Sequence, residues 1–114
     1  MKRQRLYLQD MLDSMNRIAN YIQGESYDTF VNHQMLVDAV VRNLEIIGEA
    51  AGKVSDELRE RVPEVPWKQM KGLRNIMIHE YFEIDKSIIW NIAFMDLPKA
   101  RAQIEQIIAE EVIE

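Results

Sequence analysis

The segment from Trp67 to His79 carries the residue types that can act on a phosphodiester. It contains Lys68, Lys71 and Arg74 and no acidic residue, although the whole chain has 19 acidic residues against 14 basic ones and a net charge of −5. Arginine offers a planar fork that fits phosphate oxygens, and a histidine that titrates near neutral pH can transfer protons at a phosphodiester. The segment therefore predicts a local phosphate-binding site in an acidic protein.

A helical conformation would gather the polar residues of this segment on one side. At about 100° per residue, several of them fall within about 80° of one another, namely Lys68, Lys71, Asn75 and His79. The apolar residues that lie opposite are expected to enter the core, namely Met70, Leu73 and Met77. The pattern therefore predicts an amphipathic helix with a cationic stripe.

Arg74 and His79 are the candidates for the chemical step. His79 falls in the expected last turn of the helix, where the helix dipole favours a protonated imidazole by about 0.3–1 kcal/mol. Asn75, one turn before His79, can hold the imidazole or the phosphate. Arg74 lies roughly 140° around the helix from His79, so the two can flank one phosphate only in a shallow site. We therefore predict a homodimer in which the second copy supplies another arginine and another histidine.

Ordinary structural roles compete with these assignments. Arginine, asparagine and histidine are common on helix surfaces, and spacing without structural context is weak evidence for catalysis. Tyr81 can equally be a half-buried aromatic residue whose hydroxyl is hydrogen-bonded. Trp67 fits the core better than a ligand site, and we interpret His33 as a solvated helix residue.

Glu45 and Glu49 form a carboxylate pair one helical turn apart, which suits a metal ion as well as ion pairing. Basic residues lie close to both in the sequence, at Arg42 and Lys53. Ion pairing on a solvated face is therefore the expected role, and no metal site is predicted.

Two amphipathic segments are expected to position the cationic helix. The first ends near Gly24, a residue type that commonly terminates helices, and its apolar residues recur at the spacing of one helical face: Leu8, Met11, Leu12, Met15, Ile18, Ala19 and Ile22. The second runs from about Asp28 to Gly52 with the same spacing: Val37, Val40, Val41, Leu44, Ile47, Gly48 and Ala51. Small residues at Gly48 and beyond would let another helix approach closely.

Caps and prolines delimit the remaining helices. Ser55 is expected to cap a short helix with acids in its first turn, and two prolines then break the chain, so that the cationic helix runs from about Pro66 to Glu80. After a turn through residues 82–84, Asp85 can cap a fourth helix, whose apolar residues are Ile88, Ile89, Ile92 and Met95. Pro98 suits the first turn of a fifth, whose apolar face comprises Ala100, Ile104, Ile107, Ile108 and Val112.

The totals favour a single all-α domain over residues 1–114, a compact bundle of about five helices. Hydrophobic residues make up 47% of the chain, which is enough for a core. Cysteine is absent, so disulfides and thiolate metal sites are excluded and a cytoplasmic location is expected. No apolar run approaches the roughly 18 residues of a membrane span, and no partnership with a membrane is predicted.

The stretch Arg74-Asn75-Ile76-Met77-Ile78-His79-Glu80-Tyr81 resembles the R-x-x-x-x-H-x-Y motif of the HepT family, within the HEPN superfamily. The resemblance extends from about Asp38 to Ile107. It includes the family's second-helix pattern at residues 42–50, Pro66-Trp67 and Gly72-Leu73 before the arginine, and a turn at Asp96-Leu97-Pro98. It implies a helical bundle with an up-and-down four-helix core that dimerises with the motif at the interface.

The same resemblance implies a function. Family members act as toxins of toxin–antitoxin pairs and as metal-independent endoribonucleases without a cofactor. By position in the motif, Arg74 and His79 would be catalytic and Asn75 would assist. Lys68 and Lys71, which belong to the cationic stripe rather than to the motif, are the expected contacts of RNA phosphates. The ribose 2′-OH would attack the adjacent phosphate and leave a 2′,3′-cyclic phosphate and a 5′-OH. The expected substrate is RNA, either tRNA or mRNA.

Regulation is implied by the tyrosine of the motif. Tyr81 matches the residue that the partner antitoxin, an MNT-type minimal nucleotidyltransferase, modifies with AMP. An adenylate there would add negative charge and bulk beside His79 and repel the RNA. The alternative function is a non-catalytic helical subunit that docks a nucleotidyltransferase; an intact Arg74 and His79 pair favours the nuclease.

Overall fold

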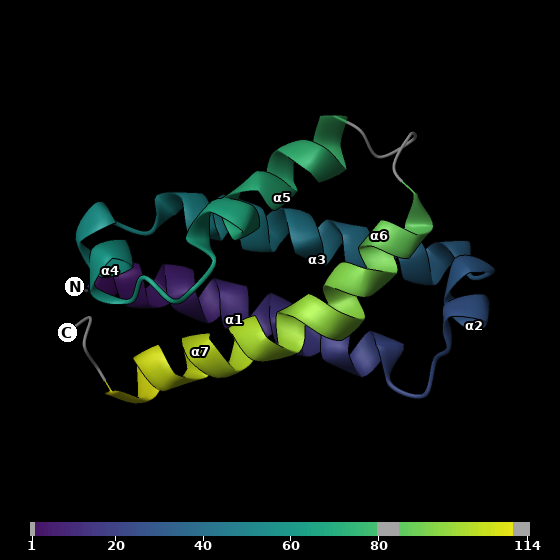
Figure 1. Ribbon diagram of the computed structural model, residues 1–114, viewed down its shortest axis with the longest axis horizontal. Helices are drawn as coiled ribbons and strands as arrows, with labels where there is room; N and C mark the ends of the chain where they lie inside the picture. The colour runs from purple at the N-terminus through teal and green to yellow at the C-terminus, as the bar shows by residue number, and fades with distance from the viewer. Residues whose placement is uncertain (1, 80–84, 111–114) are drawn as a thin grey trace.

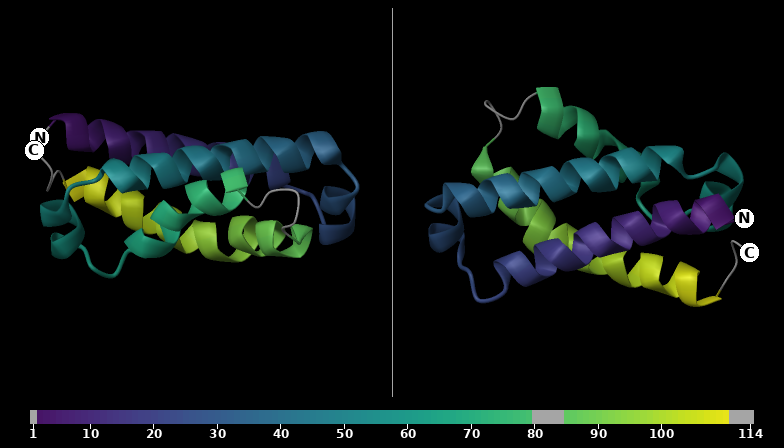
Figure 2. Two further views of the ribbon diagram at one scale, coloured as in Figure 1. Left: turned by 90° about the horizontal axis from the view of Figure 1, so that it is seen from above. Right: turned by 180° about the vertical axis from the view of Figure 1, so that it is seen from behind.

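Four long helices carry the core of the protein, for which the computed structural model describes residues 2–79 and 85–110. Helices α1 (Lys2–Ile22) and α3 (Gln34–Lys53) lie side by side and run antiparallel. Helix α5 (Trp67–His79) packs on α3, and α7 (Leu97–Glu110) packs on α1 (Figure 1). Figure 2 shows from behind that α1 lies between α3 and α7. The expectation of an all-α bundle is confirmed for the described residues.

Short helices connect the long ones. Helix α2 (Tyr27–Val31) joins α1 to α3 at one end of the bundle, and α4 (Asp56–Arg61) follows α3 at the other (Figure 1). Helix α6 (Lys86–Asn91) continues through a π-helix, η1 (Ile92–Asp96), directly into α7. None of the described helices combines the length and the apolar character that a membrane crossing requires.

The predicted apolar faces of α1 and α3 form the centre of the core. All the apolar residues predicted on the α3 face are buried, and on the α1 face the buried residues are Leu8, Met11, Met15, Ile18 and Ile22. Gly24 follows the end of α1 with φ +80°, a left-handed conformation that other residues rarely adopt. The periodicity and the terminating glycine therefore positioned both faces correctly.

The single helix predicted from Asp28 to Gly52 is wrong at its beginning, because the segment is divided at Asn32 and His33. Ser26 caps α2 in a capping box with Thr29, and the Asn32 side chain donates a hydrogen bond to the carbonyl of Asp28 at 2.8 Å. Such local bonds compete with helix continuation. His33 is exposed, as predicted, but lies in the break before α3 rather than in a helix.

Two predicted caps are confirmed. The Ser55 hydroxyl accepts a hydrogen bond from the backbone N–H of Leu58 at 3.2 Å, and α4 begins directly after it with two acidic residues in its first turn. Asp85 caps α6 by accepting from the backbone N–H of Ser87 at 2.8 Å, and this hydrogen bond lowers the pKa of the Asp85 carboxyl below its ordinary value.

The turn expected at Asp96-Leu97-Pro98 is wrong, since a continuous helix passes through these residues. The N–H of Leu97 donates to the carbonyl of Ile92, five residues earlier, and forms the wide turn of η1. Pro98 then falls in the first turn of α7, directly after this wide turn. On α6 and η1, Ile89 is buried as its spacing suggests, whereas Ile88 and Met95 are exposed.

Candidate phosphate-binding site on α5

Helix α5 is seated closely on α3 through Gly48. A Cβ atom added to Gly48 would collide with the backbone nitrogen of Arg74 and lie 3.0 Å from both the Arg74 Cβ and the Met70 carbonyl oxygen. The backbone of α5 therefore occupies the space that any larger residue would need. This contact confirms the expected close approach of a helix at Gly48, and it places the backbone of Arg74 directly on α3.

A hollow of about 320 Å³ opens between α3 and α5 next to this contact. Lys71, Arg74 and Asn75 line it from α5, and Gly48, Glu49, Gly52 and Lys53 line it from α3. The Lys71 chain lies over Gly52, where an added Cβ would be 3.6 Å from its Cγ. All three α5 residues are exposed and have no ion-pair partner among the described residues. Their charges and amide are therefore available to a phosphate.

The carboxylates of α3 are engaged with neighbouring cations. Glu49 Oε1 lies 3.8 Å from Lys53 Nζ, and Glu45 Oε2 lies 3.5 Å from Arg42 Nη1. The predicted ion pairing is thus confirmed. Lys53 also lies over the Tyr7 ring, with Nζ 5.9 Å from its centroid. No cluster of three metal-ligating side chains occurs within residues 2–79 and 85–110. Glu49 contributes a carboxylate to the α3 side of the hollow.

The cationic stripe predicted on α5 is bordered by a different hollow on each of its two flanks. Lys71 and Asn75 line the hollow against α3, together with Arg74. Lys68 instead lines a separate groove of about 820 Å³ on the other side, where α5 faces η1 and the start of α7. Angular spacing grouped these residues correctly on one helix but could not place the neighbouring helices that separate them.

The core side of α5 agrees with the prediction where the structure describes it. Met70 and Leu73 are buried, as is Trp67, whose indole Nε1 donates to the Val62 carbonyl at 3.0 Å. His79 is the last residue of α5, as its place in the final turn required. The side chains of His79 and Met77, and all of Tyr81, lie outside the described residues.

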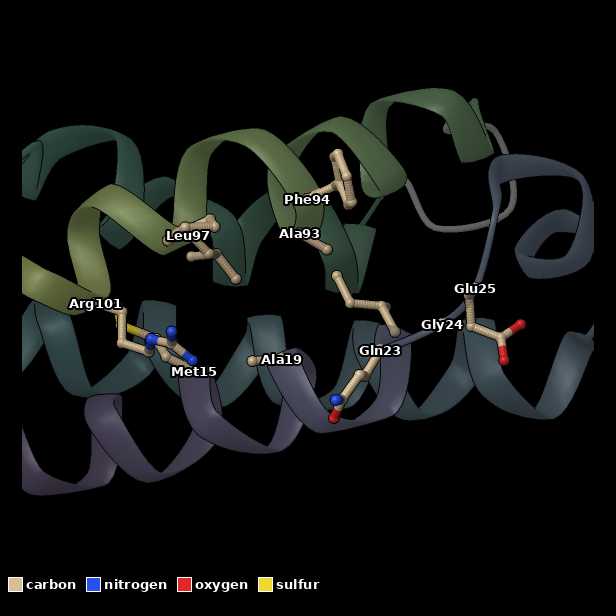
Figure 3. Close-up of a pocket in the computed structure, with 11 residues that line it drawn as sticks. Met15, Ala19, Gln23, Gly24, Glu25, Ala93, Phe94, Leu97 and Arg101 are labelled. Atoms are coloured by element: carbon tan, nitrogen blue, oxygen red, sulfur yellow. The ribbon is translucent and has the colours of Figure 1, made fainter.

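A third hollow, of about 250 Å³, lies between the end of α1 and the η1–α7 junction (Figure 3). Phe94, Leu97 and Arg101 approach it from one side, and Gln23 and Glu25 from the other. None of the candidate catalytic or phosphate-binding residues proposed from the sequence lines it. The sequence did not assign three lining residues from α3 to the hollow between α3 and α5, namely Glu49, Gly52 and Lys53. Of these, only Gly52 carries a signal in the sequence, because a glycine inside an expected helix is unusual.

A comparison with known protein families identifies the family of this chain. The family described as ribonuclease HepT-like matches residues 11–107, which include both walls of the hollow. The chain belongs to this HepT-like family. Its ribonuclease class is therefore confirmed at the level of the family.

Three proteins similar to this chain carry ribonuclease names. "Putative RNase MJ1380" of Methanocaldococcus jannaschii is 44% identical over 99 residues, which cover 87% of this chain and 91% of that protein. "Putative RNase TTE0752" of Caldanaerobacter subterraneus is 38% identical over 97% of this chain and 99% of that protein. "Probable ribonuclease HepT" of Thermococcus cleftensis is 31% identical over 89% and 92%. No solved structure matches this chain.

Proposed function

We propose that this HepT-like chain is a metal-independent endoribonuclease and the toxin of a toxin–antitoxin pair. The observation that carries the proposal is the set of exposed groups that Lys71, Arg74 and Asn75 present at one hollow of an otherwise acidic protein, where neither cation has an ion-pair partner among the described residues. A guanidinium, an ammonium and an amide side by side are suited to hold the non-bridging oxygens of one RNA phosphate. Lys68, one turn before them, would bind a neighbouring phosphate.

The chemistry requires a base and an acid but no oxidant or metal. A neutral imidazole of His79 takes the proton of the ribose 2′-OH as its oxygen attacks phosphorus. The 5′-oxygen leaves as this bond forms and receives a proton from a protonated imidazole. The products are a 2′,3′-cyclic phosphate and a 5′-OH, and Arg74 stabilises the negative charge that develops on the phosphate oxygens.

A homodimer would supply both protonation states at once. His79 ends α5 and Arg74 lies five residues earlier, so one helix presents them on different sides. Two copies of α5 related by a two-fold axis would bring one arginine and one histidine from each chain around a single phosphate. Light scattering at micromolar concentration should then give twice the 13.5 kDa of one chain; a 13.5 kDa species would contradict the composite site.

The decisive experiment compares the two histidines of the chain. His79→Ala should abolish growth inhibition on induced expression and RNA cleavage by the purified protein, with a loss of at least about 100-fold. His33→Ala is the matched control, because His33 is exposed in the break before α3 and should change neither property. Cleavage that persists in excess chelator would support metal independence.

Two results would contradict the nuclease proposal. One is unimpaired growth with the unmodified protein and no cleavage of total RNA in vitro, which would favour a non-catalytic subunit that docks a nucleotidyltransferase. The other is equal activity of the wild type and His79→Ala. A chelator-sensitive activity would overturn metal independence alone.

Tyr81 is the proposed acceptor of AMP from an antitoxin of the nucleotidyltransferase class. The transfer would join the tyrosine oxygen to the α-phosphate of ATP, release pyrophosphate and place a negative phosphodiester two residues after His79. Co-expression with the nucleotidyltransferase should raise the intact mass by whole AMP units, and Tyr81→Phe should remain unmodified. An unmodified wild-type chain under these conditions would contradict this mode of regulation.

A further inference from the structure

The groove on the far side of α5 has the composition of a binding site, and none of its lining residues belongs to the hollow between α3 and α5. Its walls are α5 on one side and η1 with the start of α7 on the other, and its volume is about 820 Å³. The apolar lining comes from Met70, Leu73, Ile92, Met95 and Leu97. Met95 is 65% exposed, although methionine side chains are usually buried. The groove is therefore both apolar and open.

Gly72 forms part of this groove and has no structural purpose within the described chain. It lies in the middle of α5, where glycine is about 1 kcal/mol less favourable than alanine. It does not have a positive φ, and a Cβ added to it would meet no described atom within 4 Å. The missing side chain thus leaves the α5 backbone open on the groove side, where an external flat group can approach it closely.

The polar residues of the groove identify the kind of group. Lys68 on one wall and Lys99 on the other are exposed and lack ion-pair partners among the described residues. Gln69 and Asp96 offer an amide and a carboxylate within the groove. A nucleobase could place its apolar faces against the apolar lining of the groove, donate an amino hydrogen to the Asp96 carboxylate and leave its flanking phosphates to the two lysines.

The groove also lies in register with the catalytic end of α5. His79 follows Gly72 by seven residues, which is two helical turns and about 10 Å along the axis. The two positions therefore lie on the same side of the helix. A strand whose scissile phosphate is held at the end of α5 would pass over Gly72 within a few nucleotides.

We propose that this groove binds a nucleobase of the RNA, within a few nucleotides of the cleaved bond, and that Gly72 keeps it open. The inference rests on the RNA-cleaving function proposed above and adds a base-recognition subsite to it. Binding of RNA in the groove would require the bases of the strand, whereas binding in the hollow between α3 and α5 would require only its phosphates.

The test fills the groove and compares two strands. The probes are a 2′-O-methyl oligoadenylate of about 12 nucleotides, which lacks the attacking hydroxyl, and an abasic strand of the same length and charge. Gly72→Leu should weaken binding of the oligoadenylate about tenfold and leave binding of the abasic strand unchanged. Gly72→Ala should give a smaller loss in the same direction. Ala102→Leu adds leucine at an exposed position of α7 outside the groove and should have no effect.

Each other outcome overturns the inference in a recognisable way. Unchanged oligoadenylate binding by Gly72→Leu shows that no base enters the groove. An equal loss for both strands shows that the groove follows the RNA backbone. A change of oligomeric state in Gly72→Leu, measured by light scattering, shows that a second copy occupies the groove. Failure of the wild-type protein to cleave any RNA would refute the proposed function itself. This result comes from a cleavage assay on the wild-type protein and does not depend on the Gly72 variants.

Discussion

Gly48 of α3 contacts one side of α5, and Gly72 lies on the other side of α5 itself. A methyl group added to Gly48 would meet crowded atoms, whereas one added to Gly72 would meet open space. At Gly48 it collides with the backbone of Arg74, whereas at Gly72 it reaches no described atom within 4 Å. The first glycine allows two helices to touch within the chain. The second leaves a space that no described part of the chain fills.

This difference separates two reasons for a helical glycine. One is packing, where the entropic cost of glycine is offset by the closeness of the contact it permits. The other is access, where no described residue offsets the same cost by a close contact. The proposed base-binding groove requires a glycine of this second kind.

The largest expected effect is that of Gly48→Ala. The added methyl group has no space, so α5 must move away from α3, and we expect a loss of about 1–3 kcal/mol in the free energy of unfolding. Urea denaturation measures this loss. RNA cleavage should fall as well, because the displaced segment carries Arg74. Gly52→Ala is the control: its methyl group makes ordinary contact with Lys71 and should not destabilise the fold.

Gly72→Ala should have the opposite sign. Alanine removes the helix penalty of glycine without a clash, so we expect a gain of about 0.5–1 kcal/mol in the free energy of unfolding. The same denaturation curves report it. A loss of stability at this position would mean that the monomer already uses the space, and the contrast between the two glycines would disappear.

The smallest expected effect concerns the lysines on the two sides of α5. Lys71→Gln removes a charge from the hollow and Lys68→Gln removes one from the groove. If both lysines contact phosphates of one bound strand, each change should reduce the slope of log K against log salt by about 0.7. Arg17→Gln, at an exposed position of α1, should leave the slope unchanged. A change in only one of the two lysine variants would confine the RNA to one side of α5.

Much of the fold followed from the sequence because burial imposes helical spacing. The apolar positions of α1 and α3 belong to this class. The caps at Ser55 and Asp85 followed instead from residue types that accept hydrogen bonds from the first turn of a helix, and the start of α5 at Trp67 followed from the proline before it. The break at Asn32 escaped prediction, since a side-chain hydrogen bond makes it without glycine or proline. Such a bond depends on local geometry that residue spacing does not specify.

The sequence identified the residues of the candidate site, but it did not indicate that they line two separate hollows. The sequence indicates that Lys68, Lys71 and Asn75 share one side of a helix, yet α3 and α7 approach α5 from different directions and separate them. The contribution of Glu49 and Lys53 from α3 was equally hidden, because it depends on which faces of two distant segments meet.

The π-helix before Pro98 has a consequence for how the length of this chain can vary in evolution. Eight residues separate the buried Ile89 and Leu97 over two turns, where an α-helix needs about seven. Deletion of one residue from η1 would keep both side chains inward, but Pro98 would then stand inside a regular helix, at a cost of about 3 kcal/mol. The extra residue of η1 and the proline that follows it are therefore expected to be gained or lost together. Such a change in length would fall in the middle of a helix rather than in a loop.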